Sequence, residues 1–462
     1  MRPVVDGWAP ALGGLATALL PVLQQRGGAW VAMREPGDDA PLRQGLPEDA
    51  PRVQIRRLPL DDHEFDAYYH GMSNRVLWPL VHYFVESVEP DRSYWEAYRS
   101  VNRRFAAAAV DCAVDDESPI FWVHDYQLML APELIRGARP DARIGHFWHV
   151  PWPAPEIFRI VPSAQSMLRG MLAADLIGFH TEGYAENFRE GARDLLGARI
   201  VPKDDGEGFD VEWEGRRVRV EARPIGIDVG EFETLGADPY VAREALVTRE
   251  EAGDVERLIV GIDRLDYTKG LPLRLEAFER FLETYPEWHR RVTLFQVCTP
   301  SRTGIPAYDH LRRVVDEIVG RINGRFAEGH WVPVRYRYRA FAQEELAVLY
   351  RAADVALVTP LRDGMNLVAL EYAAVQEGAG ALILSELTGA ADYLDGAILV
   401  NPYDTDALVQ TIRVALDMPL AERRARMARM KASIAVLDVH LWAEGFLSSL
   451  TGVEAGGAAI SR

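Results

Sequence analysis

The stretch "VALVTPLRDGMNLVALEY", residues 355–372, joins a predicted buried strand to a predicted helix through a charged loop. Four apolar residues open it, and an arginine, an aspartate and a glycine come before the helical pattern begins. In parallel α/β sheets, ligands bind beyond the carboxyl ends of the strands. A strand that is followed by Arg362, Asp363 and Gly364 therefore predicts both an α/β fold and a ligand site.

The same alternation of short apolar runs with longer amphipathic segments recurs along the chain. The runs are "IFWVHD", "RIGHFWHVP" and "LIGFHT" in the first half, and "RLIVGIDR", "VTLFQVC", "VALVTP", "GALILSE" and "AILVNP" in the second. Continuous apolar strands separated by helices are typical of parallel sheets that are covered on both faces. We expect an α/β protein with two Rossmann-like domains that face each other across a cleft.

The two series of strands are separated by "DDGEGFDVEWEGRRVRVEARPIGIDVGEF", which predicts a hairpin followed by an extended crossing. We place the domain boundary near Ile227. The predicted domains are residues 1–227 and 228–436. A C-terminal helix within 437–462 is expected to pack back on the first domain.

The chain carries 51 Lys and Arg against 69 Asp and Glu, a formal net charge of −18. This charge disfavours nonspecific binding to nucleic acid or to an anionic membrane. No apolar run reaches the roughly 18–20 residues of a membrane span, and we interpret the apolar start "ALGGLATALLPVL" as a helix rather than a signal sequence. The two cysteines, Cys112 and Cys298, lack metal-ligand spacing. We expect a soluble cytoplasmic protein and leave open its association into a homo-oligomer.

Two carboxylates, Asp363 and Glu371, flank the start of the helix predicted after residue 363. They are eight residues apart, which on a helix corresponds to about 12 Å. This is wider than the roughly 5–9.5 Å between the paired acids of a glycosidase, so they are better placed to hold two parts of one long ligand. The amides between them, those of Gly364, Met365, Asn366 and Leu367, predict a diphosphate site at a helix N-terminus. A helix-capping aspartate and a solvated glutamate explain the pair equally well.

A second charged loop, "GIDRLDYTKG" at residues 261–270, follows the predicted strand "RLIVGI". Its cations Arg264 and Lys269 suit the charge of a departing nucleoside diphosphate, and surface salt bridges are the alternative. Gly13 and Gly14 precede an apolar helical run and fit either a phosphate loop or a plain tight turn. The histidines lack a metal-ligand arrangement such as HExxH, so we predict neither a metal nor another cofactor.

Aromatic and histidine side chains gather in the first half, in "YYHGMSNRVLWPLVHY" and "HFWHVPWP". Aromatic faces beside polar groups commonly bind sugars, so these two stretches are candidates for a sugar site. The alternative is that the aromatic rings form a core and that the histidine at a strand end is a structural residue.

Taken together, these motifs resemble retaining glycosyltransferases of the trehalose-6-phosphate synthase family. The similarity runs over nearly the whole chain and includes "WVHDYQLMLAPELIR", "HVPWPAPEIFRIVP", "RLDYTKGLPLRLEAFERFL", "VTPLRDGMNLVALEY" and "VNPYDTDAL". It implies two Rossmann-like domains of the GT-B type and a reaction without metal. The implied reaction moves glucose from a nucleoside diphosphate glucose (UDP-, GDP- or ADP-glucose) to glucose 6-phosphate and retains the anomeric configuration.

The resemblance also implies roles for individual residues. The implied catalytic residues are Asp125, His149, Arg264, Lys269 and Asp363. The implied donor-binding residues are Gly13, Gly14, His149, Arg264, Lys269, Asp363, Gly364, Met365, Asn366, Leu367 and Glu371. The implied acceptor-binding residues are Arg2, Tyr69, Trp78, Asp125 and Arg302. No enzyme nucleophile is needed if the leaving phosphate itself takes the proton of the acceptor hydroxyl.

The chain departs from the family pattern at three places, one of which is Leu370, where the family often has lysine before "EY". It begins "MRPVV" without the strand that precedes the glycine loop in the family, so either the start lies upstream or the first sheet lacks a central strand. The "YYHGM" variant moves toward the glucosylglycerol-phosphate synthases. Two alternatives therefore stay open: a transferase that uses another phosphorylated acceptor, such as glycerol 3-phosphate or a cyclitol phosphate, and a non-catalytic sugar-phosphate sensor.

Overall fold

The computed structural model describes residues 2–4, 7–9, 19, 22–23, 26–34, 36, 53–203, 208–253, 255–302 and 305–452. The candidates Gly13 and Gly14 lie outside these residues. Arg2 lies in the short strand β1 (Arg2–Val4), and its side chain is outside the description. The chain forms two compact units. Unit 1 comprises Met1–Pro224 and His440–Arg462, and unit 2 comprises Ile225–Val439.

Unit 1 is built on a six-stranded sheet with the strand order β5-β6-β7-β10-β9-β8. Its strands are β5 (Ile120–His124), β6 (Arg143–Phe147), β7 (Leu176–Phe179), β8 (Arg199–Pro202), β9 (Phe209–Trp213) and β10 (Arg216–Ala222). Neighbours among β5, β6, β7 and β10 pair in parallel, whereas β9 is antiparallel to β8 and β10, which confirms the predicted hairpin. Two small sheets pair β1 with β2 (Gly7–Ala9), and β3 (Gly28–Arg34) with β4 (Val53–Pro59).

The helices of unit 1 follow from capping residues and apolar faces in the sequence. They are α2 (Asp62–Phe65), the π-helix η1 (Asp66–Leu77), α3 (Trp78–Val81), η2 (Val85–Ser87), α4 (Arg92–Cys112), η3 (Tyr126–Leu128), α5 (Ala131–Ala138), α6 (Pro155–Phe158), α7 (Ala164–Met171), α8 (Glu182–Leu196) and α17 (Val439–Thr451). Thr181 begins α8 by accepting a hydrogen bond from the amide of Tyr184, and Gly197 ends it in the left-handed conformation.

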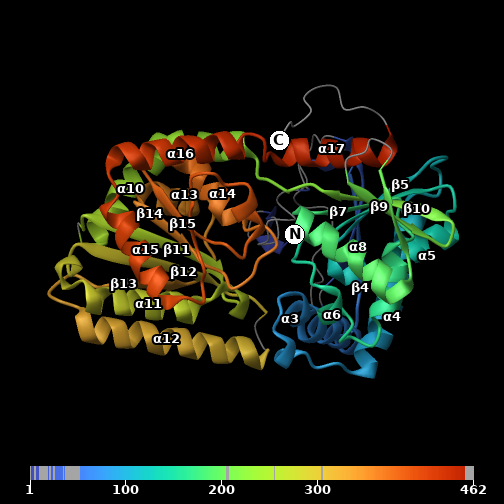
Figure 1. The fold of residues 1–462 in the computed structure, drawn as a ribbon, viewed down its shortest axis with the longest axis horizontal. Coiled ribbons are helices and arrows are strands. Elements are labelled where there is room, and N and C mark those ends of the chain that lie inside the picture. The colour runs from blue at the N-terminus through green and yellow to red at the C-terminus, as the bar shows by residue number, and fades with distance from the viewer. Residues whose placement is uncertain are drawn as a thin grey trace. The chain divides into compact units, whose positions relative to one another are not determined.

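Unit 2 contains a six-stranded parallel sheet with the order β13-β12-β11-β14-β15-β16. Its strands are β11 (Arg257–Arg264), β12 (Val292–Thr299), β13 (Val334–Tyr338), β14 (Val355–Val358), β15 (Ala381–Ser385) and β16 (Ile398–Val400). Its helices are α9 (Val229–Ala237), α10 (Pro239–Glu251), η4 (Tyr267–Lys269), α11 (Leu271–Thr284), η5 (Pro286–Trp288), α12 (Pro306–Phe326), α13 (Gln343–Ala352), α14 (Leu367–Val375), η6 (Gly389–Asp392), α15 (Thr405–Asp417) and α16 (Leu420–Ile434). In Figure 1, α11 and α12 cover one face of the sheet, and α10, α13 and α14 cover the other.

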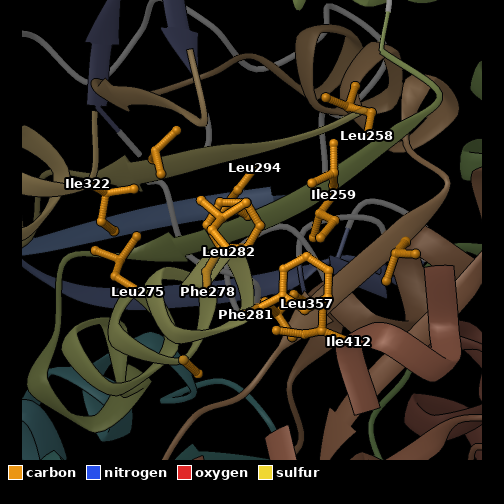
Figure 2. Close-up of a cluster of buried hydrophobic side chains, with 14 of the residues drawn as sticks. Leu258, Ile259, Leu275, Phe278, Phe281, Leu282, Leu294, Ile322, Leu357 and Ile412 are labelled. Carbon is orange, nitrogen blue, oxygen red and sulfur yellow. The ribbon is translucent and has the colours of Figure 1, made fainter. Parts of the chain in front are cut away.

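The core of unit 2 holds α11 against the sheet. Phe278, Phe281 and Leu282 of α11 are fully buried, and Figure 2 shows them beside the strand residues Leu294 and Leu357. Burial of each such side chain contributes about 1.5–3 kcal/mol to folding. The loop that precedes α11 therefore ends at a firmly packed helix.

The C-terminal helix α17 packs on unit 1 at two glycines of the sheet. Phe446 of α17 is fully buried and stacks on Trp122 of β5, with ring centroids 4.9 Å apart. A Cβ added at Gly145 of β6 or at Gly178 of β7 would approach the Phe446 ring to 2.6 or 2.8 Å. The missing side chains thus make the space that this ring fills.

These observations confirm the predicted α/β class with parallel sheets. Among the described residues, every helix is too short or too polar to cross a membrane.

We expect Gly145→Ala to destabilise unit 1 by about 1–3 kcal/mol, because the added methyl group overpacks the buried Phe446 ring. The matched control is Gly191→Ala in α8, where an added Cβ meets nothing within 4 Å and helix propensity improves. Urea unfolding measures both, and hydrogen exchange in α17 reports local loosening. Equal stability of the two variants would show that α17 does not depend on this contact.

Candidate functional site

The carboxyl edge of the unit 2 sheet brings two charged loops together. β11 ends at Arg264, and the following loop forms the turn η4 and then Gly270, which has a positive φ of 65°. The amide of Leu361, in the loop after β14, donates to the carbonyl of Thr268 over 2.7 Å. A Cβ on Gly270 would lie 2.8 Å from the carbonyl oxygen of Thr359, so only glycine allows this approach of the two loops.

An ion pair joins the two loops directly. Lys269 Nζ lies 2.5 Å from Asp363 Oδ2, and the two side chains are only 12% and 18% exposed. Asn366 Nδ2 donates to the same carboxylate oxygen over 3.0 Å. Lys269 thus forms the salt bridge that the alternative expected, but the pair is largely shielded from water and does not lie open on the surface.

The start of α14 differs from the sequence prediction. Asn366 caps the helix, with its side chain accepting from the amide of Ala369, and α14 begins at Leu367. The capping aspartate considered as an alternative is therefore wrong, because Asp363 precedes the cap. Of the predicted diphosphate-binding amides, only that of Leu367 belongs to the helix itself.

Glu371, in the first turns of α14, accepts a hydrogen bond from the hydroxyl of Tyr350 over 2.7 Å. Burial raises the pKa of Glu371, and the hydrogen bond from Tyr350 opposes that rise. The carboxylate is thus held in one position by a neighbouring helix, α13, which carries Tyr350.

Asp266 is a fully buried carboxylate that connects the Lys269 loop to Arg302. Its Oδ1 accepts from the amide and the hydroxyl of Thr268, over 3.1 and 3.0 Å. Its Oδ2 lies 2.9 Å from Nη1 of Arg302, whose side chain is 5% exposed and also contacts the hydroxyl of Tyr308. The predicted acceptor arginine is therefore anchored on the loop that carries Lys269.

Arg274 is a buried residue behind the same loop that sequence reasoning missed. It forms an ion pair with Asp263 and donates from Nε to the Thr359 hydroxyl over 3.0 Å. Its Nη2 donates to the carbonyl of Lys269 over 3.4 Å. The available signal was an arginine on the apolar face of the segment "LPLRLEAFERFL", where a solvent-exposed arginine is not expected.

Unit 1 gathers four histidines at the carboxyl edge of its parallel strands. They are His124 at the end of β5, His146 in β6, His149 after β6 and His180 after β7. Burial lowers the pKa of His124 to about 3 and of His146 to about 4, and lowers that of His149 well below 6.5. The rings of His124, His146 and His149 are therefore neutral at pH 7.

Asp125 lies among these histidines in a strained backbone conformation. Its φ of 67° and ψ of −179° are almost confined to glycine, at a cost of about 1–3 kcal/mol. Its carboxylate accepts from the amide of His149 over 3.3 Å, and its carbonyl contacts His146 Nε2 over 3.1 Å. Arg302 and Asn366 also have positive φ, as do Tyr83, Glu214 and Arg290, which are not predicted site residues.

The predicted aromatic residues differ in their surroundings. Trp78 is 6% exposed and packs on His82 and Tyr126, with ring centroids 4.2 and 5.8 Å apart, which favours the core interpretation. Tyr69 is partly buried on η1 and lines, with His124, a cavity of about 1440 Å³.

Comparison with known proteins identifies the family. The profile of glycosyltransferase family 20 matches residues 5–452. The chain belongs to glycosyltransferase family 20. Its membership confirms the resemblance and the predicted two-domain α/β fold, and it makes the charged loops of unit 2 and the histidines of unit 1 parts of a glycosyltransferase.

Relatives and solved structures of family 20 cover almost all of the chain. It is 40% identical to the UDP-forming α,α-trehalose-phosphate synthase of Schizosaccharomyces pombe, over 96% of this chain and 86% of the relative. It is 41% identical to the trehalose-6-phosphate synthase of Mycobacterium avium, over 96% and 90%. The crystal structure of the Burkholderia xenovorans enzyme in complex with glucose-6-phosphate has a TM-score of 0.88 and 36% identity, covering 97% of this chain and 99% of that one. The E. coli enzyme bound with UDP-2-fluoro glucose has a TM-score of 0.87 and 36% identity, covering 97% and 98%.

We expect the buried His146 to make unit 1 sensitive to acid. Its folded-state pKa, about 4, lies below the unfolded value of 6.5, so the unfolded chain binds the proton first as the pH falls. The contribution of His146 to the free energy of unfolding is therefore fully present above pH 6.5 and is lost as the pH falls toward 4. The loss reaches about 2 kcal/mol at pH 5. His146→Gln should flatten the slope of unfolding free energy against pH, while the exposed-histidine control His310→Gln should not. An unchanged slope in His146→Gln would contradict the assignment.

Proposed function

We propose that the chain transfers glucose from UDP-glucose to glucose 6-phosphate, retains the anomeric configuration and releases UDP. One observation carries the proposal: the relatives that share 40% or more of its residues over 96% of its length are UDP-forming trehalose-phosphate synthases or trehalose-6-phosphate synthases. The similarity to structures in complex with glucose-6-phosphate and with UDP-2-fluoro glucose supports both substrates.

In this proposal, residues of unit 2 bind the donor. Arg264 and Lys269 neutralise the diphosphate, and the amides of residues 364–367 complete its site. Asp363 accepts from hydroxyl groups of the donor glucose, and Glu371 accepts from those of the ribose. The contacts of Lys269 and Glu371 support these roles, because each side chain is already held in place by a hydrogen-bonded neighbour.

The acceptor residues carry over from the family resemblance. Asp125 and Tyr69 would bind the sugar of glucose 6-phosphate, and Arg302 would bind its phosphate, with Arg2 as a second cation. The burial of Trp78 supports a core role in place of the sugar contact that the resemblance implies.

The reaction requires no covalent enzyme intermediate. The bond from the anomeric carbon to the diphosphate oxygen breaks, and a bond from that carbon to the acceptor oxygen forms on the same face. The acceptor proton passes to the leaving diphosphate, whose charge Arg264 and Lys269 stabilise. His149, whose neutral ring can donate one hydrogen bond and accept another, would contact the donor glucose.

The predicted domain roles and location enter the proposal in the same way. Residues 1–227 would form the acceptor domain and residues 228–436 the donor domain. A cytoplasmic location is supported by Cys112 and Cys298, which are free thiols and therefore fit a reducing compartment.

The deciding experiment is product identification. The protein is incubated with UDP-glucose and, separately, with glucose 6-phosphate, glycerol 3-phosphate or a cyclitol phosphate, in the presence of a chelator. We expect trehalose 6-phosphate and UDP from the first acceptor. A product from glycerol 3-phosphate alone would favour the glucosylglycerol-phosphate alternative, and tight sugar-phosphate binding without any product would favour the sensor.

We expect Lys269→Ala and Arg264→Ala each to lower kcat by roughly two to three orders of magnitude, because loss of a charge stabiliser in a shielded site costs about 2.7–4 kcal/mol. Steady-state kinetics measure the effect. Lys431→Ala is the matched control, since Lys431 in α16 contacts a backbone carbonyl of α14 away from both loops. Wild-type turnover in either loop variant would remove the leaving-group role.

We expect Arg302→Ala to raise the acceptor KM by about 10- to 100-fold, because a charged hydrogen bond to the phosphate is lost. The donor KM should change much less. Tyr308→Phe removes the hydroxyl that contacts Arg302 but leaves Asp266 as the anchor of this arginine. This control should therefore bind the acceptor nearly normally. If Arg302→Ala weakens donor and acceptor equally, the arginine serves the Lys269 loop and the phosphate binds elsewhere.

A further inference from the structure

A second histidine contacts the His149 ring inside unit 1. His124 is the last residue of β5, and His149 follows β6, the parallel neighbour of β5. Nδ1 of His124 lies 3.0 Å from Nε2 of His149. The two imidazoles therefore meet through their ring nitrogens at hydrogen-bonding distance.

A hydrogen bond between two neutral imidazoles couples their tautomers. Each ring has one N–H and one bare nitrogen, so one ring must donate and the other must accept. If Nε2 of His149 accepts from His124, its other ring nitrogen, Nδ1, carries the proton and is a donor. If Nε2 donates, Nδ1 is an acceptor. Burial keeps both rings uncharged, because it lowers the pKa of His124 to about 3 and that of His149 well below 6.5.

The backbone of His149 is held on both sides, which leaves its ring to be oriented by side-chain neighbours. Its amide donates to the Asp125 carboxylate over 3.3 Å, and its carbonyl accepts from His180 Nε2 over 3.2 Å. The indole of Trp442 in α17 packs 5.9 Å from the His149 ring and 6.4 Å from the His124 ring. The hydrogen bond between His124 and His149 is the directional contact in this packing.

We propose that His124 is a positioning residue that orients the His149 ring and couples the tautomer of His149 to its own, and thereby sets the hydrogen-bonding state that Nδ1 of His149 presents to the donor glucose. The inference rests on the proposed role of His149 toward the donor. His124 acts only through His149 and touches no substrate in this account.

Two substitutions separate the hydrogen bond from the packing. His124→Phe keeps a ring against Trp122 and Trp442 but cannot form the hydrogen bond. His124→Asn keeps a donor and an acceptor close to the position of Nδ1. We expect His124→Phe to lower kcat by about 10- to 100-fold with a smaller change in donor KM, and His124→Asn to recover most of that loss.

The spectroscopic readout is the pair of ring nitrogen shifts of His149, which differ between a bare and a protonated nitrogen. We expect one tautomer in the wild-type protein and in His124→Asn, and a mixture in His124→Phe. Trp122→Phe is the packing control, because Trp122 contacts the His124 ring, 4.7 Å between centroids, without taking part in the hydrogen bond. This control should keep a single tautomer and near-normal kcat.

Three results would overturn the inference. One is a single, unchanged tautomer in His124→Phe. The second is an equal loss of kcat in His124→Phe, His124→Asn and Trp122→Phe, which would assign the effect to packing. The third, if His124→Phe does not fold, is a mixed tautomer in a folded His124→Asn. A separate result, wild-type turnover in His149→Ala, would remove the proposed role of His149, and the nitrogen shifts would still report the coupling of the two rings.

Discussion

The parallel pairing of β11 with β12 and β14 is the constraint on which the unit 2 site depends. Because the three strands run in the same direction, Arg264 at the end of β11 stands in register with Thr299 at the end of β12, and the loop after β14 opens at the same edge. The Leu361–Thr268 backbone hydrogen bond then ties two of these loops together. Antiparallel pairing would have sent alternate loops to opposite edges, and no common site would form.

Two cations near the unit 2 site form ion pairs with carboxylates of the chain. Lys269 is paired with Asp363, and Arg302 is paired with Asp266. Burying a charge is costly unless it is paired, so these carboxylates allow a protein of net charge −18 to keep cations in shielded positions. In the proposed function, a phosphate group that binds such a cation meets a side chain whose orientation is already set, which lowers the entropy cost of binding.

Unit 1 differs from unit 2 because three of its shielded histidines are neutral rather than paired. Desolvation lowers the pKa of His124, His146 and His149, so their charge is suppressed instead of paired. The Nδ1 atom of His146 has no hydrogen-bond partner among the described residues, while its Nε2 contacts the strained Asp125 backbone. Such an arrangement gives up stability, and it holds Asp125 and His149 in a fixed relation that a relaxed loop would not maintain.

The sequence by itself determined the α/β class, the parallel strands, the hairpin and the family, because these follow from the spacing of apolar residues and from motifs of neighbouring residues. It also predicted that Arg264, Lys269 and Asp363 follow strand ends. Only the tertiary structure decided that Asp266 links Lys269 to Arg302, that Arg274 is buried behind the loop, that Trp78 lies in the core, and that His124 meets His149. These contacts join residues far apart in sequence, and strand order, register and helix packing bring them together, which no local pattern encodes.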